Sequence, residues 1–283
     1  MNHAIILISC PDHRGITAAV TGFVYAHNGN IIHADQHIDN QSNTFFMRIE
    51  WALEGFDIPE SEIKSAFAPI AERFNMVWNL YFDRGKKNIA VFVSRPLHCL
   101  QDILLRHGQG EISGTLRLII SNHEDARPLA ERAGIPFYFL PITSENKADQ
   151  ETQELKLLAD ADINLIVLAR YHQILSQNFV EKYPNRIINI HHSFLPAFQG
   201  RNPYEQAFRQ GVKIIGATSH FVVEELDAGP IIEQDTVRVS HRDTIADFKR
   251  KGRDLEKTVL SRSLRWALEN KILSYENKTV IFD

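Results

Sequence analysis

The sequence has only two cysteines, Cys10 and Cys99, among its 283 residues. Two thiols cannot form the disulfide framework of a small secreted domain. The first residues, MNHA, also lack the cationic stretch, apolar run and cleavage site of a secretory signal. The sequence therefore predicts reduced thiols and a cytoplasmic location.

Long hydrophobic runs and an excess of basic charge are absent as well. The longest apolar stretches, such as Leu165 to Ala169, are far shorter than the roughly 18 to 20 residues that cross a bilayer. The 31 Lys and Arg residues are outnumbered by 35 Asp and Glu residues, which gives a formal net charge of -4. Such a chain has little to attract a phosphate backbone or an anionic membrane. We therefore expect no nucleic-acid partner and no membrane partner.

What is present is the composition of an ordinary folded protein, with 44% hydrophobic and 23% charged residues. At about 150 residues per domain, the length predicts two domains. Residues 1–82 alternate between strand-like and helix-like periods in the order β-α-β-β-α-β, which is the ferredoxin-like arrangement. The expected strands are Ala4–Ser9, Ile31–Ile38, Asn43–Trp51 and Met76–Phe82, and the expected helices are Ile16–His27, ending at a left-handed cap at Asn28-Gly29, and Pro59–Arg73.

The second part of the chain has a different pattern. The aperiodic run Asp83 to Asn88 separates the two, so we predict a first domain at 1–83, a linker at 84–87 and a second domain at 88–283. Strands separated by long helices are typical of a mostly parallel, Rossmann-like α/β sheet. The expected strands are Ile89–Ser94, Thr115–Ser121, Phe137–Leu140, Leu165–Ala169 and Arg186–His191, with helices at Leu97–His107, Asp125–Ala133, Asn146–Asp160, Pro203–Gln210 and Thr244–Leu268. Lys213–Val223 and Ile231–Ser240 look like an antiparallel extension.

An amide and an imidazole end the strand that precedes Pro196. Asn189 and His191 are two residues apart, so their side chains share one face of that strand. They also lie at its carboxyl end, where open α/β sheets form ligand crevices. A turn at His191-His192, with Asn189 capping backbone groups, is an equally good interpretation from spacing alone. A metal site is a weaker one, because adjacent strand residues point to opposite faces.

Two further polar residues lie downstream. Asp227, in the stretch DAGP, fits an ordinary turn in which Asp bonds its own backbone. His220 taken alone is more typical of a structural histidine than of a catalyst.

Three ordered stretches, Asn189 to Pro196, Gly216 to Val222 and Glu225 to Ile232, strongly resemble the folate-dependent formyltransferase family. The resemblance implies that Asn189, His191 and Asp227 are the catalytic residues, with His220 in a supporting role. The segment Leu168 to Ser176 is similar to the family's pterin-binding stretch, which implies folate contacts at Gln173, Ile174 and Leu175. Core packing is the alternative for Ile174 and Leu175.

Within this family, the loop after the first strand of the second domain indicates whether the acceptor molecule carries a phosphate. Family members that act on a phosphorylated acceptor carry a glycine-rich loop there, whose N–H groups cradle the phosphate. The equivalent loop here, Ser94 to Leu100, has no glycine and contains a proline. A phosphate-bearing acceptor is therefore disfavoured. A transferase acting on tRNA is disfavoured too, because we expect such an enzyme to carry a further C-terminal RNA-contacting domain.

The N-terminal region resembles an ACT domain, a ferredoxin-like module that binds amino acids. The stretches Asp12 to Ile16 and His27 to Ile31 carry the likeness, and it implies an amino-acid effector site at Asp12, Gly15, Gly29 and Asn30. ACT modules also imply a homo-oligomer. The stretches Asp35 to Asp39 and Phe45 to Glu50 closely resemble formyltetrahydrofolate deformylases, which join an ACT module to a formyltransferase-like domain. This resemblance implies hydrolysis of 10-formyltetrahydrofolate, with formate supplied and one-carbon pools balanced for purine biosynthesis.

That reaction needs a folate substrate and no metal or other cofactor. Asn189 and His191 would stabilise the tetrahedral intermediate, while Asp227 would accept a proton from water or hold the imidazolium. For the first of these roles we expect partial burial to raise the pKa of Asp227. Two alternatives are a formyltransferase that acts on an unphosphorylated amine and an inactive, amino-acid-sensing binding protein.

Overall fold

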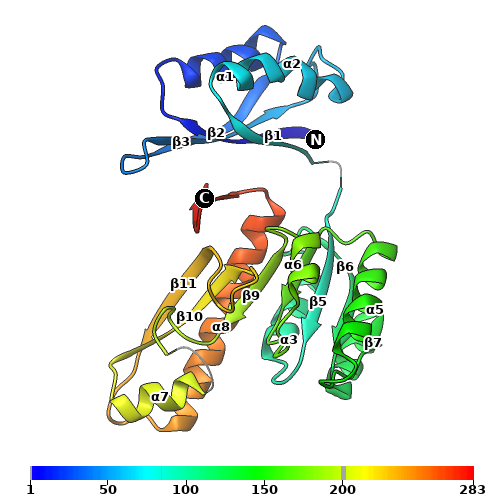
Figure 1. Cartoon of the computed structure of the whole chain (residues 1–283), viewed down its shortest axis with the longest axis vertical. Helices are drawn as coiled ribbons and strands as arrows, with labels where there is room; N and C mark the ends of the chain where they lie inside the picture. Colours follow the sequence, from blue (N-terminus) through cyan, green and yellow to red (C-terminus); the bar gives the residue numbers. More distant parts are fainter. Residues whose placement is uncertain (1, 84, 199–201) are drawn as a thin grey trace. The chain divides into compact units, whose positions relative to one another are not determined.

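A computed structural model describes residues 2–83, 85–198 and 202–283 of the chain. The chain forms two compact units (Figure 1). The first comprises residues 1–86, 270–275 and 280–283, and the second comprises residues 87–269 and 276–279. Sequence analysis assigned all residues after 87 to the second domain, whereas the structure returns most of the last 14 residues to the first unit. Arg84, in the expected linker, lies outside the described residues.

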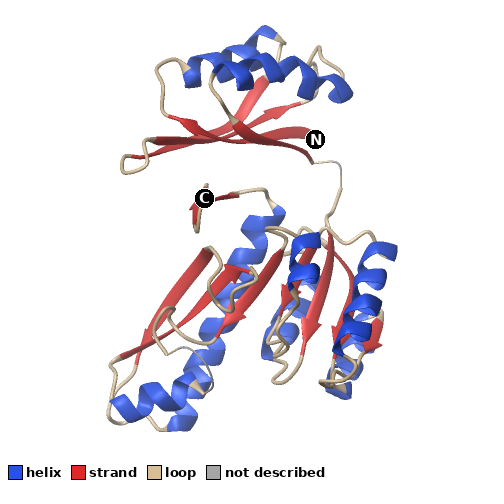
Figure 2. Cartoon of the chain, viewed as in Figure 1, coloured by secondary structure: helices blue, strands red, loops and turns tan. Residues whose placement is uncertain are grey.

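The first unit is a four-stranded antiparallel sheet with two helices on one face (Figure 2). Its strands lie in the order β2-β3-β1-β4, as the ferredoxin-like prediction requires. The elements are β1 (His3–Pro11), α1 (Ile16–Ala26), β2 (Asn30–Asp39), β3 (Thr44–Ala52), α2 (Glu60–Arg73) and β4 (Val77–Phe82). Alternate residues of β1 and β3, including Ile6, Ile8 and Met47, pack against the helices in a buried core.

The end of α1 has the left-handed cap expected at Asn28-Gly29. The left-handed residue is Asn28, with φ of 57°, and not Gly29. Gly29 is required for a different reason, because a Cβ there would lie 2.5 Å from a side-chain carbon of Val24. The amide of Gly29 donates to the Val24 carbonyl at 2.8 Å, which closes the helix.

A C-terminal hairpin completes the other face of this sheet and was not predicted. It consists of β12 (Ile272–Tyr275) and β13 (Lys278–Ile281). Leu273 and the following Phe282 join Leu7 and Phe46 of the sheet in a second buried cluster. The hairpin therefore supplies part of the hydrophobic core of the first unit.

The second unit is built on a seven-stranded sheet in the order β11-β10-β9-β8-β5-β6-β7. Five neighbouring strands, β9, β8, β5, β6 and β7, run parallel to one another. β10 and β11 extend the sheet beyond β9 as antiparallel strands, as predicted. The strands are β5 (Asn88–Val93), β6 (Thr115–Ser121), β7 (Phe137–Phe139), β8 (Leu165–Leu168), β9 (Ile187–His191), β10 (Ile214–Phe221) and β11 (Ile231–Arg238). The chain leaves β5 toward β6 and later returns to β8 on its other side, which creates a switch point where crevices form.

The helices of this unit are α3 (His98–Gly108), α4 (Arg127–Ala133), α5 (Lys147–Asp160), α6 (Gln177–Lys182), α7 (Pro203–Gln210) and α8 (Ile245–Leu268). Sequence analysis missed only the short α6 among them. The 24-residue α8 begins at a capping box in which Thr244 and Asp247 bond each other's backbone amides. This helix packs against β9, β10, β11, α3 and α7, so it carries buried side chains to several parts of the unit. Among the described residues, no helix has the length and apolar character needed to span a bilayer.

Candidate active site

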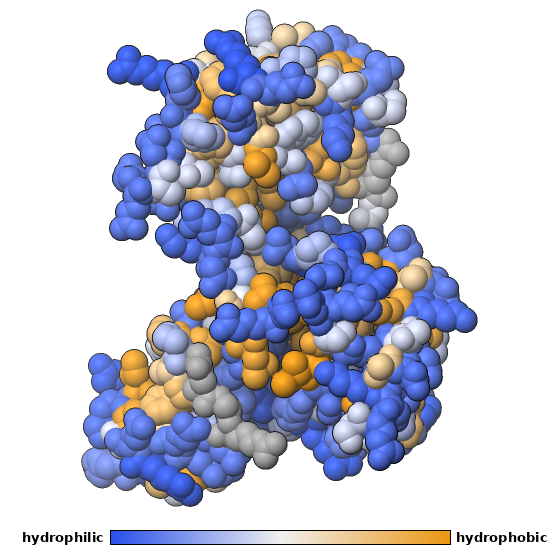
Figure 3. All heavy atoms as spheres, in the orientation of Figure 1, coloured by the Kyte–Doolittle hydropathy of each residue, from blue (hydrophilic) through white to orange (hydrophobic). Residues whose placement is uncertain are grey.

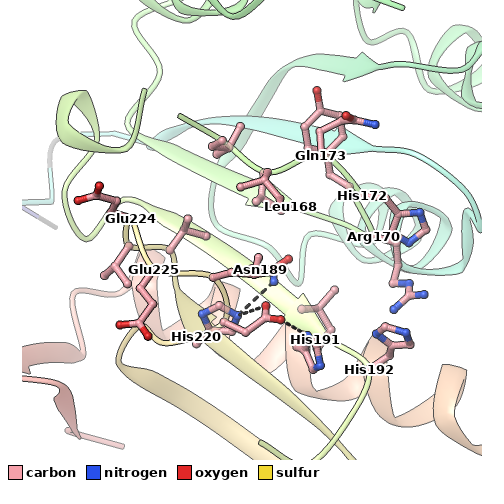
Figure 4. Close-up of a pocket in the computed structure, with 18 of the residues that line it drawn as sticks. Leu168, Arg170, His172, Gln173, Asn189, His191, His192, His220, Glu224 and Glu225 are labelled. Carbon is pink, nitrogen blue, oxygen red and sulfur yellow. Dashed lines mark hydrogen bonds and ion pairs between the residues drawn. The ribbon is translucent and has the colours of Figure 1, made fainter. Parts of the chain in front are cut away.

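A cavity of about 570 Å³ lies in the second unit at the carboxyl ends of β8 and β9. Its walls come from the loop after β8, the end of β9 and the connection between β10 and β11 (Figure 4). The lining residues are Leu168, 170–175, 189–192, Asn202, His220 and 222–227. All the residues assigned to catalysis and folate contact line this one cavity, at the place where an open α/β sheet forms its crevice.

Asn189 and His191 project from the same face of β9, as their spacing predicts. The antiparallel partner strand β10 places His220 directly opposite Asn189. The Asn189 Nδ2 and His220 Nε2 atoms are 3.1 Å apart, and His220 Nδ1 lies 2.9 Å from the Phe221 carbonyl oxygen. Because a carbonyl can only accept, Nδ1 carries the proton in the neutral ring and Nε2 accepts from the amide. His220 thereby fixes the orientation of Asn189.

Asp227 approaches both histidines from the β10–β11 connection. Its Oδ2 lies 3.2 Å from His191 Nδ1, and its Oδ1 lies 3.6 Å from His220 Nε2. Gly229 makes this approach possible, because a Cβ there would lie 1.8 Å from the carbonyl oxygen of Phe221. The turn signal in the sequence is therefore correct, and the turn also delivers a carboxylate to the two imidazoles.

The protonation state of Asp227 differs from the expectation. Burial raises the pKa of this carboxyl, but the hydrogen bond and charge of His191, together with those of His220 when its ring is protonated on both nitrogens, outweigh burial and hold the pKa well below its usual range. The predicted rise was wrong, because sequence alone did not show that two imidazoles face the carboxylate. Asp227 is therefore ionised at neutral pH and suited to holding an imidazolium.

His191 is the residue left with a free polar atom. Its Nδ1 faces Asp227, whereas its Nε2 is buried without a hydrogen-bond partner among the described residues. Buried polar atoms are nearly always paired, so an unpaired one calls for an explanation. An imidazole held by a carboxylate on one nitrogen and unpaired on the other is arranged to exchange a proton with a bound molecule.

Comparisons with known proteins agree with this geometry. Residues 87–264 match the formyl transferase family, and residues 4–70 match the ACT domain family. The chain is 53% identical over 279 residues to a formyltetrahydrofolate deformylase of Synechocystis, covering 99% of this chain and 98% of that one. The crystal structure of a formyltetrahydrofolate deformylase from Pseudomonas syringae superposes with a TM-score of 0.97 at 46% identity, covering 100% and 95% of the two chains.

The chain belongs to the formyltetrahydrofolate deformylase family. A more distant likeness is to a glycinamide ribonucleotide transformylase from Symbiobacterium toebii, with a TM-score of 0.66 and 32% identity over 72% of this chain and 98% of that one. The likeness to deformylases extends over the whole chain, whereas the likeness to the transformylase covers less than three quarters of it.

In this member of the deformylase family, the loop after β8 lines the cavity with the residues assigned to folate contact. Gln173 is half-buried, Ile174 is 56% exposed, and Leu175 is buried in the core beside α5 and α6. Leu175 is therefore a residue of the hydrophobic core, whereas the exposed side chain of Ile174 can contact the ring of a ligand. The space-filling view in Figure 3 shows hydrophobic atoms reaching the surface in the middle of the second unit.

Two carboxylates of α5 accept hydrogen bonds from this loop. The Tyr171 hydroxyl donates to Glu154 Oε1 at 2.9 Å, and the backbone amide of Ser176 donates to Glu151 Oε1 at 2.9 Å. Both ends of the loop are thus tied to one helix. Burial raises the pKa of Glu154 to about 7, against the opposing hydrogen bond from Tyr171.

Sequence analysis missed three charged or aromatic groups beside the catalytic residues. Arg170 has the left-handed φ of 64°, which is uncommon outside glycine, and its Nε lies 3.4 Å from the buried Glu256. Burial lowers the pKa of His192 to about 3, with Arg170 adding to the effect, so its ring is neutral. The ring of Tyr204 meets that of His192 edge-on, with centroids 5.9 Å apart. No spacing signal marks these residues, because they meet only through the tertiary fold.

One cluster in the described part of the chain has the composition of a metal site, namely His98, Cys99 and Glu256, whose ligand atoms lie within 4.8 Å of one another. Its chemistry does not suit a cation. Burial and the nearby Glu256 raise the pKa of the Cys99 thiol well above its ordinary value, so the thiolate that a metal needs is disfavoured. The Arg170 guanidinium also already lies against the Glu256 carboxylate.

The four residues assigned to an amino-acid effector do not come together in the first unit. Asp12 and Gly15 precede α1, whereas Gly29 and Asn30 follow it. A helix of 11 residues separates the two pairs by about 16 Å. Gly15 has φ of 93° as the cap of α1, so its conformation explains why glycine is found there.

Proposed function

We propose that this chain hydrolyses 10-formyltetrahydrofolate to tetrahydrofolate and formate. The observation that carries the proposal is the arrangement of Asn189, His191 and Asp227 around one cavity, with Nε2 of His191 unpaired. Relatives that share the whole chain at up to 53% identity are named for this activity.

The chemistry follows from the geometry of these groups. A water molecule adds to the formyl carbon, and the carbonyl oxygen becomes an oxyanion that the Asn189 amide stabilises by donating a hydrogen bond. His191 Nε2 takes the proton that water loses and returns it to N10 as the C–N bond breaks, which releases the free amine and formic acid; the acid gives its remaining proton to solvent and becomes formate. The ionised Asp227 stabilises the imidazolium that forms between these two steps. Side chains supply every group in this scheme, so the proposal includes no metal or cofactor.

The decisive experiment incubates the purified full-length chain with 10-formyltetrahydrofolate and no amine, and measures tetrahydrofolate and formate. We expect equal amounts of both products, and a loss of about 100-fold or more in the Asp227→Ala variant. Asp254→Ala is the matched control, because Asp254 is an exposed carboxylate of α8 that pairs with Lys257. Turnover that requires an added amine would instead identify a transferase, and binding without any turnover would identify a sensor.

We further propose that the reaction takes place in the cytoplasm, where it supplies formate and balances the folate pools used for purine biosynthesis. The ACT match at residues 4–70 supports an amino-acid effector and a homo-oligomer. Calorimetric titration with single amino acids tests the first, with a change in turnover expected on binding. Light scattering tests the second, and a mass near 32.4 kDa for the chain would contradict it.

A further inference from the structure

The C-terminal hairpin is divided between the two compact units. Its strands β12 and β13 lead into and out of the core of the first unit, where Leu273 and Phe282 are buried. The hairpin tip, residues 276–279, is grouped with the second unit instead. Because the chain on both sides of the tip is fixed in a hydrophobic core, the tip has little freedom to move and can support whatever it bonds.

The hairpin tip bonds the turn that carries Asp227. The Asn277 side chain donates from Nδ2 to the Ala228 carbonyl at 2.9 Å. The Thr279 hydroxyl donates to the Ile231 carbonyl at 2.7 Å. Ala228 directly follows Asp227, and Ile231 is the first residue of β11, so the two bonds hold both ends of the segment that connects the carboxylate to the sheet.

The turn needs such support, because its own contacts hold it weakly. Asp227 has a φ of 56°, in the left-handed region that is uncommon outside glycine. A residue keeps such a conformation when the surrounding structure fixes it. The preceding residues 224–226 are exposed, and the bond within the turn, from the Ala228 amide to the Glu225 carbonyl, is long at 3.3 Å.

The position of this turn decides whether Asp227 reaches His191. The distance from Asp227 Oδ2 to His191 Nδ1 is 3.2 Å, at the long end of the range for a hydrogen bond, so a shift of about 1 Å away from the ring would break the contact. Asn277 and Thr279 are not among the described residues that line the large cavity. They can therefore affect the reaction only through the turn that they hold.

We propose that Asn277 and Thr279 are positioning residues for the hydrolysis, and that from the C-terminal hairpin they hold the turn so that Asp227 stays against His191. The proposal deepens the proposed function and rests on it. It also gives the first unit a part in catalysis, because the core that fixes β12 and β13 thereby fixes the support of the catalytic carboxylate.

The first test measures kcat for formate release by full-length variants. Removing both donors in Asn277→Ala with Thr279→Val should lower kcat by about 10- to 100-fold, the loss expected when a reacting group is misplaced by about 1 Å. Thr279→Val alone should lower kcat by a smaller factor, and Thr279→Ser, which keeps the hydroxyl, should restore it. Glu276→Gln is the matched control, because it removes an exposed charge of the same tip and leaves both bonds in place.

A double-mutant cycle separates positioning from a general weakening of the fold. In the Asp227→Ala background, the same pair of substitutions should have no further effect on kcat, because the carboxylate that they would misplace is gone. An equal loss in both backgrounds would overturn the proposal, and so would a double variant with the kcat of the wild type.

A second measurement needs no turnover. Hydrogen–deuterium exchange of the peptide covering residues 224–231 should be about 10-fold faster in the double variant than in the wild type, since two hydrogen bonds that restrain the turn are lost. Equal exchange would overturn the proposal. A wild-type chain that released no formate would refute the proposed hydrolysis, and the exchange rates would still show whether the hairpin tip holds the turn.

Discussion

Replacing Glu154 by glutamine should change how the stability of the protein depends on pH. Glu154 is 0% exposed, its Oε1 accepts the Tyr171 hydroxyl, and its Oε2 is buried without a hydrogen-bond partner among the described residues. Burial raises its pKa from 4.5 to about 7 in the folded state. Between these values the folded protein holds a proton that the unfolded chain has released, so stability falls as pH rises through this window.

The size of the effect follows from the pKa values. Because one pKa unit corresponds to about 1.36 kcal/mol, the rise from 4.5 to about 7 costs the wild type about 3 kcal/mol above pH 7, relative to acidic solution. Glu154→Gln has no proton to lose. Between pH 4.5 and pH 8 its free energy of unfolding should therefore gain about 3 kcal/mol relative to that of the wild type.

Urea unfolding followed by circular dichroism at pH 5, 6, 7 and 8 measures this difference. The exposed Glu145→Gln is the control and should follow the wild type at every pH. Parallel curves for wild type and Glu154→Gln would refute the reasoning, because they would show that Glu154 binds the same number of protons in the folded and unfolded states.

Three other predictions concern the candidate site. Because the pKa of Asp227 is lowered, turnover should show no dependence on its titration between pH 5 and 8; an acid limb that disappears in Asp227→Asn would contradict this. Gly229→Ala should reduce kcat by about 100-fold, since the added methyl meets the Phe221 carbonyl and moves the turn, and unchanged turnover would show that the turn can adapt. Leu175→Ala should lower the free energy of unfolding in urea by about 2 to 5 kcal/mol, because Leu175 is buried. Ile174→Ala should leave that free energy nearly unchanged and raise KM for the folate, because Ile174 is exposed. The reverse pattern would show that Leu175 contacts the folate and Ile174 stabilises the core.

Much of the fold follows from local sequence patterns. Strand and helix periods predict nearly every element of both units, and a period of two predicts that Asn189 and His191 share a face. The hairpin after Asn270 was missed because each of its strands has four residues, too few for a period to be recognised. The six-residue α6 was missed for the same reason.

The candidate site was predicted less completely, because much of it depends on contacts between distant segments. His220 lies opposite Asn189 through the register of β10 on β9, which no local pattern reveals. The same pairing brings a second imidazole to Asp227 and reverses the expected direction of its pKa. Glu256 is 158 residues from His98, and on the sequence it is one more polar residue of a long amphipathic helix.

The return of the chain to its first unit has a consequence for synthesis. A ribosome releases residues 1–86 long before Leu273 and Phe282 exist, so Leu7 and Phe46 lack their partners while the second unit is being made. The domain that emerges first is therefore completed last. A fragment ending at residue 86 should expose this apolar face and be more prone to aggregate than the full chain. Residues 272–283 complete the core of the N-terminal domain after the second unit has been synthesised.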